Sequence, residues 1–174
     1  MNLNSRLIMK AYIGLSCKVG AFNRVLDELI KLNLSKKDVF LLFGPVDILI
    51  QLRNLKSLDE FINKWFNPIR NITAQEVMIE RTQTLIVICE GKTFTEEPYA
   101  FLFLNTAPRN LEVVQEKLQE IPQVLSADTV LGLFDVIAAV RANDKEDLKQ
   151  LICQIQAKVP HIQGTVTSIV ASLY

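Results

Sequence analysis

The sequence predicts an α+β fold made of two tandem ferredoxin-like βαββαβ modules, of the dimeric α+β barrel type, whose antiparallel sheets pack face to face. Three observations predict this fold class: a Gly-x-x-Asp turn that occurs twice, helix and strand patterns in the same order around each copy, and strands that are apolar on both faces. Among 174 residues, 49% are hydrophobic and nine are Phe, so the chain has ample apolar material for a buried core.

The two copies of the turn, Gly44-Pro45-Val46-Asp47 and Gly132-Leu133-Phe134-Asp135, lie 88 residues apart. Beyond the Asp, the apolar positions of the following helices match at a spacing of 90, which indicates a two-residue insertion in a loop. We therefore predict a first repeat at residues 1–90, a second repeat at residues 99–174, and a polar linker at residues 91–98.

The first repeat is predicted to run strand, helix, strand, strand, helix, strand. Its expected elements are a strand at Met9–Cys17, a helix with the apolar stripe Phe22, Val25, Leu26, Leu29 and Ile30, a hairpin of Val39–Phe43 and Ile48–Leu52, a helix with the stripe Leu58, Phe61, Ile62 and Trp65, and a strand at Ala74–Glu80. Ser57 and Glu60 form a capping box at the second helix, and Pro68 is predicted to end it. Leu85–Cys89 is a short strand outside this plan.

The second repeat follows the same order. Its expected elements are a strand at Tyr99–Thr106, a helix with the stripe Leu111, Val114, Leu118 and Ile121, a hairpin about Gly132, a helix at Lys145–Lys158, and a strand from Ile162. This order of elements is the ferredoxin-like motif.

Three strands are apolar at successive positions: Phe40–Phe43, Leu85–Ile88 and Phe101–Leu104. In such a module both helices cover one face of the sheet, and the opposite face normally alternates toward water. These strands would place hydrophobic side chains on both faces, so the open faces must be covered. We expect the sheets of two repeats or of two chains to pack together, and the protein to be a homo-oligomer.

Composition argues against several classes of protein. Lys and Arg together number 19, as do Asp and Glu, so the chain lacks the excess positive charge of a nucleic-acid-binding protein. No apolar run is long enough for a signal peptide or a spanning helix, which predicts a soluble cytoplasmic protein without membrane contact. Three scattered Cys and the single His161 predict neither disulfides, a metal site, a cofactor site nor a catalytic pair. The sequence thus predicts a binding protein that is not an enzyme.

The second repeat is similar to the C-terminal effector-binding domain of the Lrp/AsnC (feast/famine) transcription regulators. The residues that carry the resemblance are Gly132-Leu133-Phe134-Asp135-Val136-Ile137-Ala138-Ala139-Val140, preceded by Tyr99-Ala100-Phe101 and Ile121-Pro122-Gln123-Val124 and followed by Val159-Pro160-His161-Ile162 and Thr165-Val166-Thr167-Ser168-Ile169-Val170. The first repeat shares mainly the Gly-x-x-Asp turn.

The resemblance implies a domain that dimerises through its sheets, assembles into rings and binds an amino acid or a similar small effector between subunits. Members of the family usually carry an N-terminal winged helix-turn-helix, whereas here the first repeat begins by about residue 8. We therefore expect a stand-alone tandem sensor that lacks its own DNA-binding domain and can also join full-length Lrp/AsnC regulators in mixed oligomers.

The ligand-binding residues are predicted at the second turn and the last strand: Gly132, Leu133, Phe134, Asp135, Thr165, Thr167 and Ser168. Backbone N–H groups at Gly132 suit a carboxylate, the Asp135 carboxylate suits an ammonium group, and the three hydroxyls complete a polar patch for a zwitterion. The alternative is that Gly132 and Asp135 only shape the hairpin and that the Thr residues only suit a strand.

The first turn, Gly44 and Asp47, is predicted to be a degenerate second site. Pro45 deletes one N–H donor. At a spacing of 90, Gln75, Val77 and Met78 would replace the three hydroxyl residues of the last strand.

Two alternative functions stay open. A ferredoxin-like dimer can enclose a cavity in which an enzyme of the dimeric α+β barrel type transforms a small molecule. The chain could also be a purely structural partner of full-length regulators, which would co-assemble without binding a ligand.

Overall fold

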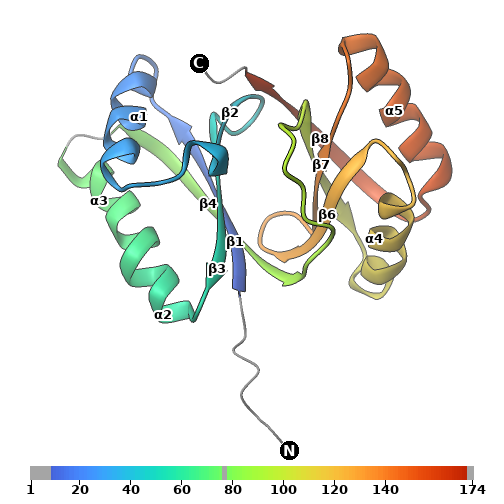
Figure 1. Ribbon diagram of the computed structural model, residues 1–174, viewed down its shortest axis with the longest axis horizontal. Coiled ribbons are helices and arrows are strands. Elements are labelled where there is room, and N and C mark those ends of the chain that lie inside the picture. The colour runs from blue at the N-terminus through green and yellow to red at the C-terminus, as the bar shows by residue number, and fades with distance from the viewer. Residues whose placement is uncertain (1–8, 76–77, 172–174) are drawn as a thin grey trace, which may run out of the picture. The chain divides into compact units, whose positions relative to one another are not determined.

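The chain divides into two compact units, which we describe separately. The first comprises the described residues up to Leu41 together with Pro45–Ile86, and the second comprises Leu42–Gly44 and the described residues from Val87 on. The computed structural model describes residues 9–75 and 78–171 (Figure 1). The first eight residues of the expected first repeat therefore lie outside the described residues, and the repeat and linker boundaries stay a prediction.

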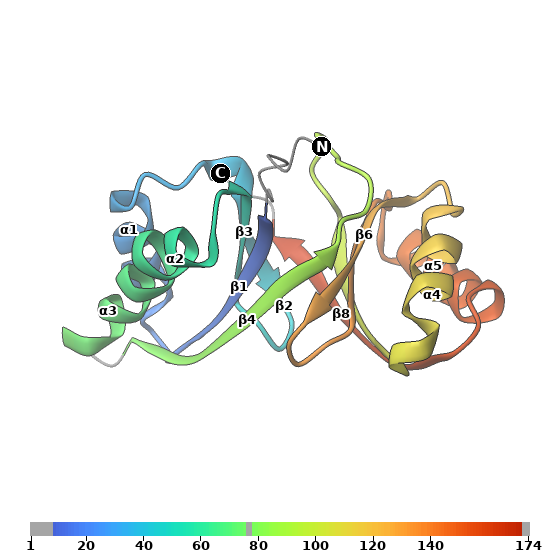
Figure 2. The ribbon, with the colours of Figure 1, turned by 90° about the horizontal axis from the view of Figure 1, so that it is seen from below.

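In the first unit the elements follow the order strand, helix, strand, strand, helix, strand. They are β1 (Met9–Cys17), α1 (Phe22–Lys31), the short η1 (Lys36–Asp38), β2 (Val39–Phe43), β3 (Ile48–Leu55), the consecutive helical segments α2 (Leu58–Glu60), η2 (Phe61–Phe66) and α3 (Asn67–Gln75), and β4 (Ile79–Cys89). β1 pairs antiparallel with β3 and with β4, and β2 pairs antiparallel with β3. Helices α1, α2 and α3 lie on one side of this sheet (Figure 2).

The second helix of the first unit begins as predicted but does not end at Pro68. Ser57 Oγ accepts from the Glu60 N–H at 3.1 Å, and the Glu60 carboxylate accepts from the Lys56 N–H at 2.7 Å, which lowers the pKa of Glu60. η2, which ends two residues before the proline, is a wider π-helical segment, and the N–H of its capping residue Asn67 donates to the Ile62 carbonyl. The wider turn accommodates a residue that has no N–H to donate, so the helix continues through Pro68.

The last strand of the first unit is longer than predicted. β4 starts at Ile79 and includes the apolar segment Leu85–Cys89, which was expected to lie outside the repeat. The predicted strand Ala74–Glu80 is wrong over Ala74 and Gln75, which belong to α3, while residues 76 and 77 lie outside the described residues.

The second unit has the same order of elements. They are β5 (Ala100–Thr106), the short η3 (Pro108–Asn110), α4 (Leu111–Gln119), β6 (Val124–Leu131), β7 (Val136–Val140), α5 (Lys145–Lys158) and β8 (Ile162–Ala171). β5 pairs antiparallel with β7 and with β8, and β6 pairs antiparallel with β7. None of the helices in the described ranges is long and apolar enough to cross a membrane.

Helices α4 and α5 cover one face of the second sheet and form its core with it (Figures 1 and 2). The residues of this core are Ala100, Leu102, Leu104, Val114, Leu118, Ile121, Val124, Ala127, Val136, Ala138, Val140, Leu148, Leu151, Ile155 and Val159. Full burial of each large aliphatic side chain stabilises the fold by about 1.5–3 kcal/mol. On β5, the residues that alternate with this set, Phe101 and Phe103, lie on the opposite face of the sheet.

The predicted fold class is wrong in how the strands are assembled. The eight strands form one closed barrel, in the order β1-β3-β2-β8-β5-β7-β6-β4, and not two tandem ferredoxin-like modules with sheets packed face to face. Hydrophobic residues on both faces of a strand show that its faces must be covered, but they do not show what satisfies the backbone groups at the edges of a sheet. Closure of a barrel pairs those edges.

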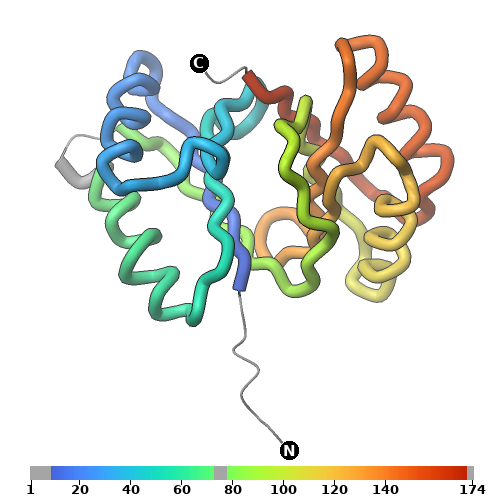
Figure 3. The backbone as a smooth tube through the Cα atoms, viewed as in Figure 1, coloured from blue at the N-terminus to red at the C-terminus, as the bar shows by residue number. Residues whose placement is uncertain are grey.

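The predicted linker is held against the second unit (Figure 3). The Gly91 N–H donates to Oδ1 of the fully buried Asp128 at 2.7 Å. The buried Gln115 Nε2 donates to the carbonyls of Cys89, at 3.1 Å, and Ala127, at 2.9 Å. A segment that is polar in sequence is thus fixed by buried hydrogen bonds to β6 and α4.

Candidate functional site

The Gly-x-x-Asp turn of the second unit is tied to the end of β5. The Asp135 N–H donates to the Leu104 carbonyl at 3.0 Å, and Asp135 Oδ2 accepts from the Thr106 N–H at 3.0 Å. This pair of bonds fixes the carboxylate beside the strand end, where β5 stops pairing with β7.

Two further side chains complete this arrangement. Asn105 Nδ2 lies 3.2 Å from the Leu133 carbonyl and 3.3 Å from Asp135 Oδ2, and it can donate to both. Thr106 Oγ1 donates to the carbonyl of His161 at 2.8 Å, and His161 has a left-handed φ of 68°. We call Asn105, Thr106, Leu133, Asp135 and His161 the second corner.

The second corner offers polar groups of both signs. Asp135 is half-buried, and its Oδ1 accepts no hydrogen bond from the described part of the chain. Within residues 9–75 and 78–171, the N–H groups of Gly132, Leu133 and Phe134 also donate no hydrogen bond. One carboxylate oxygen and three neighbouring N–H groups suit the ammonium and carboxylate of a zwitterion.

The predicted turn residues have different environments. Leu133 is 61% exposed, whereas Phe134 is 8% exposed and packs on Phe103, with the ring centroids 5.0 Å apart. Gly132 has a φ of 158°, which is close to extended backbone and uses little of the freedom of a glycine. Leu133 therefore faces solvent while Phe134 anchors the turn.

The structure does not bring the three predicted hydroxyls together. Thr165 pairs with Leu104 and Thr167 pairs with Leu102, so both lie on the face that the helices cover. Ser168 pairs with Phe101 on the opposite face, where its hydroxyl is fully buried and has no hydrogen-bond partner in the described residues. A role of all three in one site stays a prediction.

The first unit contains a second arrangement with the same bonds. The Asp47 N–H donates to the Leu15 carbonyl at 2.9 Å, and Asp47 Oδ2 accepts from the Cys17 N–H at 2.6 Å. Ser16 Oγ donates to the Pro45 carbonyl at 3.2 Å, as Asn105 does to that of Leu133. We call Ser16, Cys17, Pro45 and Asp47 the first corner.

The pairing of the strands shows that the corresponding residues of the two units differ from those that the sequence spacing predicted. Leu15 pairs with Thr82 and Ile13 pairs with Thr84, as Leu104 and Leu102 pair with Thr165 and Thr167. Corresponding residues of β4 and β8 are thus 83 positions apart in the sequence and not 90. Of the residues expected at these positions, Met78 lies outside β4 and Val77 lies outside the described residues. The residues that do correspond are threonines in both units, so this strand gives no support for a degenerate first site.

Gly44 has a packing role. A Cβ atom at this position would lie 2.9 Å from Ser168 Cβ, 3.1 Å from Ser168 Cα, and closer still to its Oγ. Real Cβ atoms do not approach that closely, so only glycine fits here without a shift of β8. This contact accounts for the first glycine of the turn without a ligand.

Cys17 is predicted to be the least reactive thiol of the protein. Burial, with the Asp47 carboxylate as a smaller cause, raises its pKa from 9.0 to about 11, whereas Cys89 and Cys153 are exposed. At pH 8 this shift reduces the thiolate fraction about a hundredfold. In a time course with a chromogenic disulfide reagent we expect two fast thiols and one slow thiol, and a faster Cys17 in Asp47→Asn. Three equal rates would contradict this assignment.

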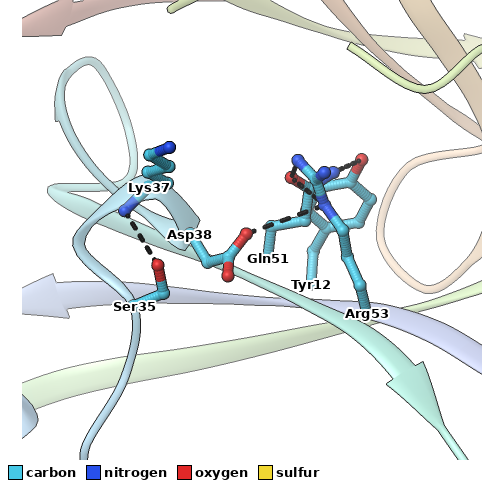
Figure 4. A network of polar contacts seen from close by, with 6 residues as sticks. All are labelled: Tyr12, Ser35, Lys37, Asp38, Gln51 and Arg53. Atoms are coloured by element: carbon cyan, nitrogen blue, oxygen red, sulfur yellow. Dashed lines mark hydrogen bonds and ion pairs between the residues drawn. The ribbon is translucent and has the colours of Figure 1, made fainter. Parts of the chain in front are cut away.

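A separate polar network lies in the first unit (Figure 4). Gln51 Nε2 donates to Tyr12 Oη at 2.9 Å, and both residues are 1% exposed. Arg53 donates to Gln51 Oε1 from Nε, at 3.0 Å, and from Nη2, and its Nε lies 3.6 Å from Asp38 Oδ1. Burial raises the pKa of Asp38, and the charge of Arg53 partly opposes that shift.

The second unit has the element order strand, helix, strand, strand, helix, strand, and it presents a turn with charged and polar groups at a strand end. Residues 99–174 match the model of the Lrp/AsnC ligand binding domain. The resemblance predicted from the sequence of the second repeat is therefore confirmed.

The chain is similar to an uncharacterized HTH-type transcriptional regulator of Pyrococcus abyssi, with 31% identity over 77 residues, which are 44% of this chain and 49% of that protein. The chain thus matches about half the length of this regulator. Its fold is that of an anthrone oxidase-like protein, with a TM-score of 0.57, 10% identity, and coverage of 97% of this chain and 93% of the other. A putative monooxygenase from Lactobacillus acidophilus gives a TM-score of 0.55, 7% identity, and coverage of 94% and 93%.

These two structures contradict the prediction that the chain is not an enzyme. An oxidase-like protein and a putative monooxygenase share its fold, so a missing sequence motif does not exclude catalysis. Tyr12 and Gln51 show the physical reason: residues 39 positions apart form a buried polar network that no linear motif records. At these identities the likeness shows the fold alone and assigns no reaction to this chain.

Proposed function

We propose that the second unit is a sensor for an amino acid, which binds at the second corner. The ligand ammonium bonds to Asp135 Oδ1, and its carboxylate bonds to the N–H groups of Gly132, Leu133 and Phe134. One observation carries this proposal: the Asp135 carboxylate is held in place through Oδ2 while its Oδ1 accepts no bond from the described residues. A fixed, half-buried acceptor binds an ammonium group with little loss of side-chain entropy.

An aliphatic amino acid suits the surroundings of the second corner. Leu133 is 61% exposed and Leu131, just before the turn, is 59% exposed. Apolar side chains this exposed, beside groups that bind a zwitterion, favour a ligand with an apolar side chain. L-leucine is therefore the first probe.

We further propose that the protein acts in transcription regulation, as an oligomer and in the cytoplasm. The family of residues 99–174 and the similarity to the Pyrococcus transcriptional regulator support the regulatory role. The exposed leucines at the turn support a contact between copies of the chain, or with full-length regulators, that covers the bound ligand.

A thermal-shift screen with the twenty amino acids tests the binding proposal. A ligand at about 100 times its dissociation constant adds about 2.7 kcal/mol to the free energy of unfolding, which raises Tm by several degrees in a chain of this length. L-leucine is expected to shift Tm, whereas 4-methylpentanoate, which lacks the ammonium group, is not. A flat screen, or an equal shift with 4-methylpentanoate, would count against Asp135 as the recognition group.

A further inference from the structure

We infer that the first unit carries a second amino acid site, at the first corner, in which the guanidinium of Arg81 replaces the N–H group that Pro45 lacks. This inference rests on the proposed function of the second corner, because it assigns the same recognition chemistry to Asp47 as to Asp135. It gives the protein two sites per chain with different anchors for the ligand carboxylate.

The carboxylates of the two corners are held by equivalent bonds. In each corner, the backbone N–H of the Asp donates to the carbonyl of a strand residue. Oδ2 of the same Asp accepts from the backbone N–H of the residue two positions further along that chain segment. Asp47, like Asp135, is half-buried, and its Oδ1 accepts no hydrogen bond from the described residues. Whatever cation Asp135 can bind through Oδ1, Asp47 can bind in the same geometry.

Charge near Asp47 does not prevent ammonium binding. The Cys17 thiol, whose pKa is raised to about 11, is neutral at pH 7, and Asp47 is the one carboxylate among the four residues of the first corner. No ion pair joins Asp47 to a cation within residues 9–75 and 78–171. The Asp47 carboxylate is therefore available to the ammonium group of a ligand.

The anchor for the ligand carboxylate differs between the corners. Pro45 stands where the second turn has Leu133, and a proline has no N–H. Across the strand pair, Ser16 faces Arg81, whereas Asn105 faces Gly164. Arg81 is exposed, and it makes no ion pair with the described residues.

The guanidinium of Arg81 can compensate for the N–H group that Pro45 lacks. The side chain of Arg81 lies on the same face of the sheet as that of Ser16, because directly opposed residues of an antiparallel pair share a face. Ser16 in turn bonds to the Pro45 carbonyl, so an extended arginine on this face reaches the turn. A guanidinium binds a carboxylate through two hydrogen bonds and replaces more than the single donor that is lost.

Isothermal titration of the purified full chain with L-leucine tests the inference. The variants are Asp135→Asn, Asp47→Asn and the double variant, since asparagine keeps an oxygen for the structural N–H bond and removes the charge. We expect two sites of full affinity in the unmodified chain, one in each single variant, and only binding weakened by about thirtyfold in the double variant. Far-UV circular dichroism and the melting temperature confirm that each variant is folded.

The outcomes separate this inference from the proposed function. If Asp47→Asn binds one equivalent and Asp135→Asn binds none, the inference is wrong and the proposed function stands. If only Asp135→Asn binds, the first corner is a site and the proposed second one is not. Absence of binding in every protein overturns both.

The role of Arg81 is tested in the Asp135→Asn background. Arg81→Gln is expected to weaken L-leucine binding about tenfold, the effect of one charge-assisted bond. Its effect on isopentylamine, which is leucine without the carboxylate, is expected to be less than about twofold. Arg70→Gln, an exposed arginine on α3, is the matched control and is expected to change neither affinity. Equal losses for both ligands would remove Arg81 from the carboxylate site.

Discussion

An Asp135→Asn variant is expected to lose affinity for L-leucine at the second corner by about thirtyfold, which corresponds to about 2 kcal/mol for one hydrogen bond to a charged group. The side-chain oxygen of asparagine can still accept from the Thr106 N–H, the bond that ties the turn to β5. The free energy of unfolding should therefore change by less than about 1 kcal/mol. Calorimetric titration in an Asp47→Asn background, with urea denaturation of the same proteins, measures both quantities.

Asp135→Ala is the matched comparison, because it removes the charge and the structural acceptor together. The Thr106 N–H then loses its partner at 3.0 Å, and Asn105 loses one of its two acceptors. We expect the same loss of affinity as in Asp135→Asn, with an additional loss of stability of about 1–2 kcal/mol. Undiminished leucine binding in Asp135→Asn would falsify the assignment of the ammonium to this carboxylate.

The Gly-x-x-Asp turn could be predicted from the sequence because its determinants lie within four residues. The partners of the Asp could not, because Asn105 and Thr106 precede Asp135 by about thirty residues and belong to no local pattern. Their role depends on where β5 ends relative to the hairpin, and only the strand register sets that. The corresponding bonds of Ser16 and Cys17 to the first turn could not be predicted from the sequence either.

The separation of two predicted site residues could have been foreseen from the sequence alone. Successive residues of a strand point to opposite faces, so Thr167 and Ser168 cannot both line one surface of β8. The true spacing between the last strands of the two units could be found only from the structure. The helical region of the first unit, with its π-helical segment and its continuation past Pro68, is longer than α5, so the spacing measured at the helices fails at the last strand. Thr82 and Thr84, and not residues 75 and 77, are the counterparts of Thr165 and Thr167.

The largest expected loss of stability is at Gly91, in the segment predicted to be a linker. A Cβ atom at this position would lie 2.7 Å from the backbone nitrogen of Ala127, 2.8 Å from its carbonyl carbon, and closer still to its oxygen. These are backbone atoms of a paired strand, which cannot rotate away as a flexible side chain can. Gly91→Ala must therefore displace either β6 or the segment itself.

Displacement of the segment also breaks the bond from the Gly91 N–H to Asp128, whose side chain is fully buried. Strain from overpacking and a weakened buried hydrogen bond together predict a loss of about 3 kcal/mol, or about 6–12 °C in Tm for a chain of this length. Differential scanning calorimetry measures this shift directly.

Gly164→Ala, on β8 of the same unit, is the matched control for Gly91→Ala. A Cβ atom there meets nothing closer than Asn105 Oδ1 at 3.8 Å, which is an ordinary van der Waals contact. The same change in composition should therefore alter the free energy of unfolding by less than about 0.5 kcal/mol. If the two variants melt at the same temperature, the close approach of Gly91 to β6 does not exist in solution, and the segment is the loose linker that its polar sequence indicates.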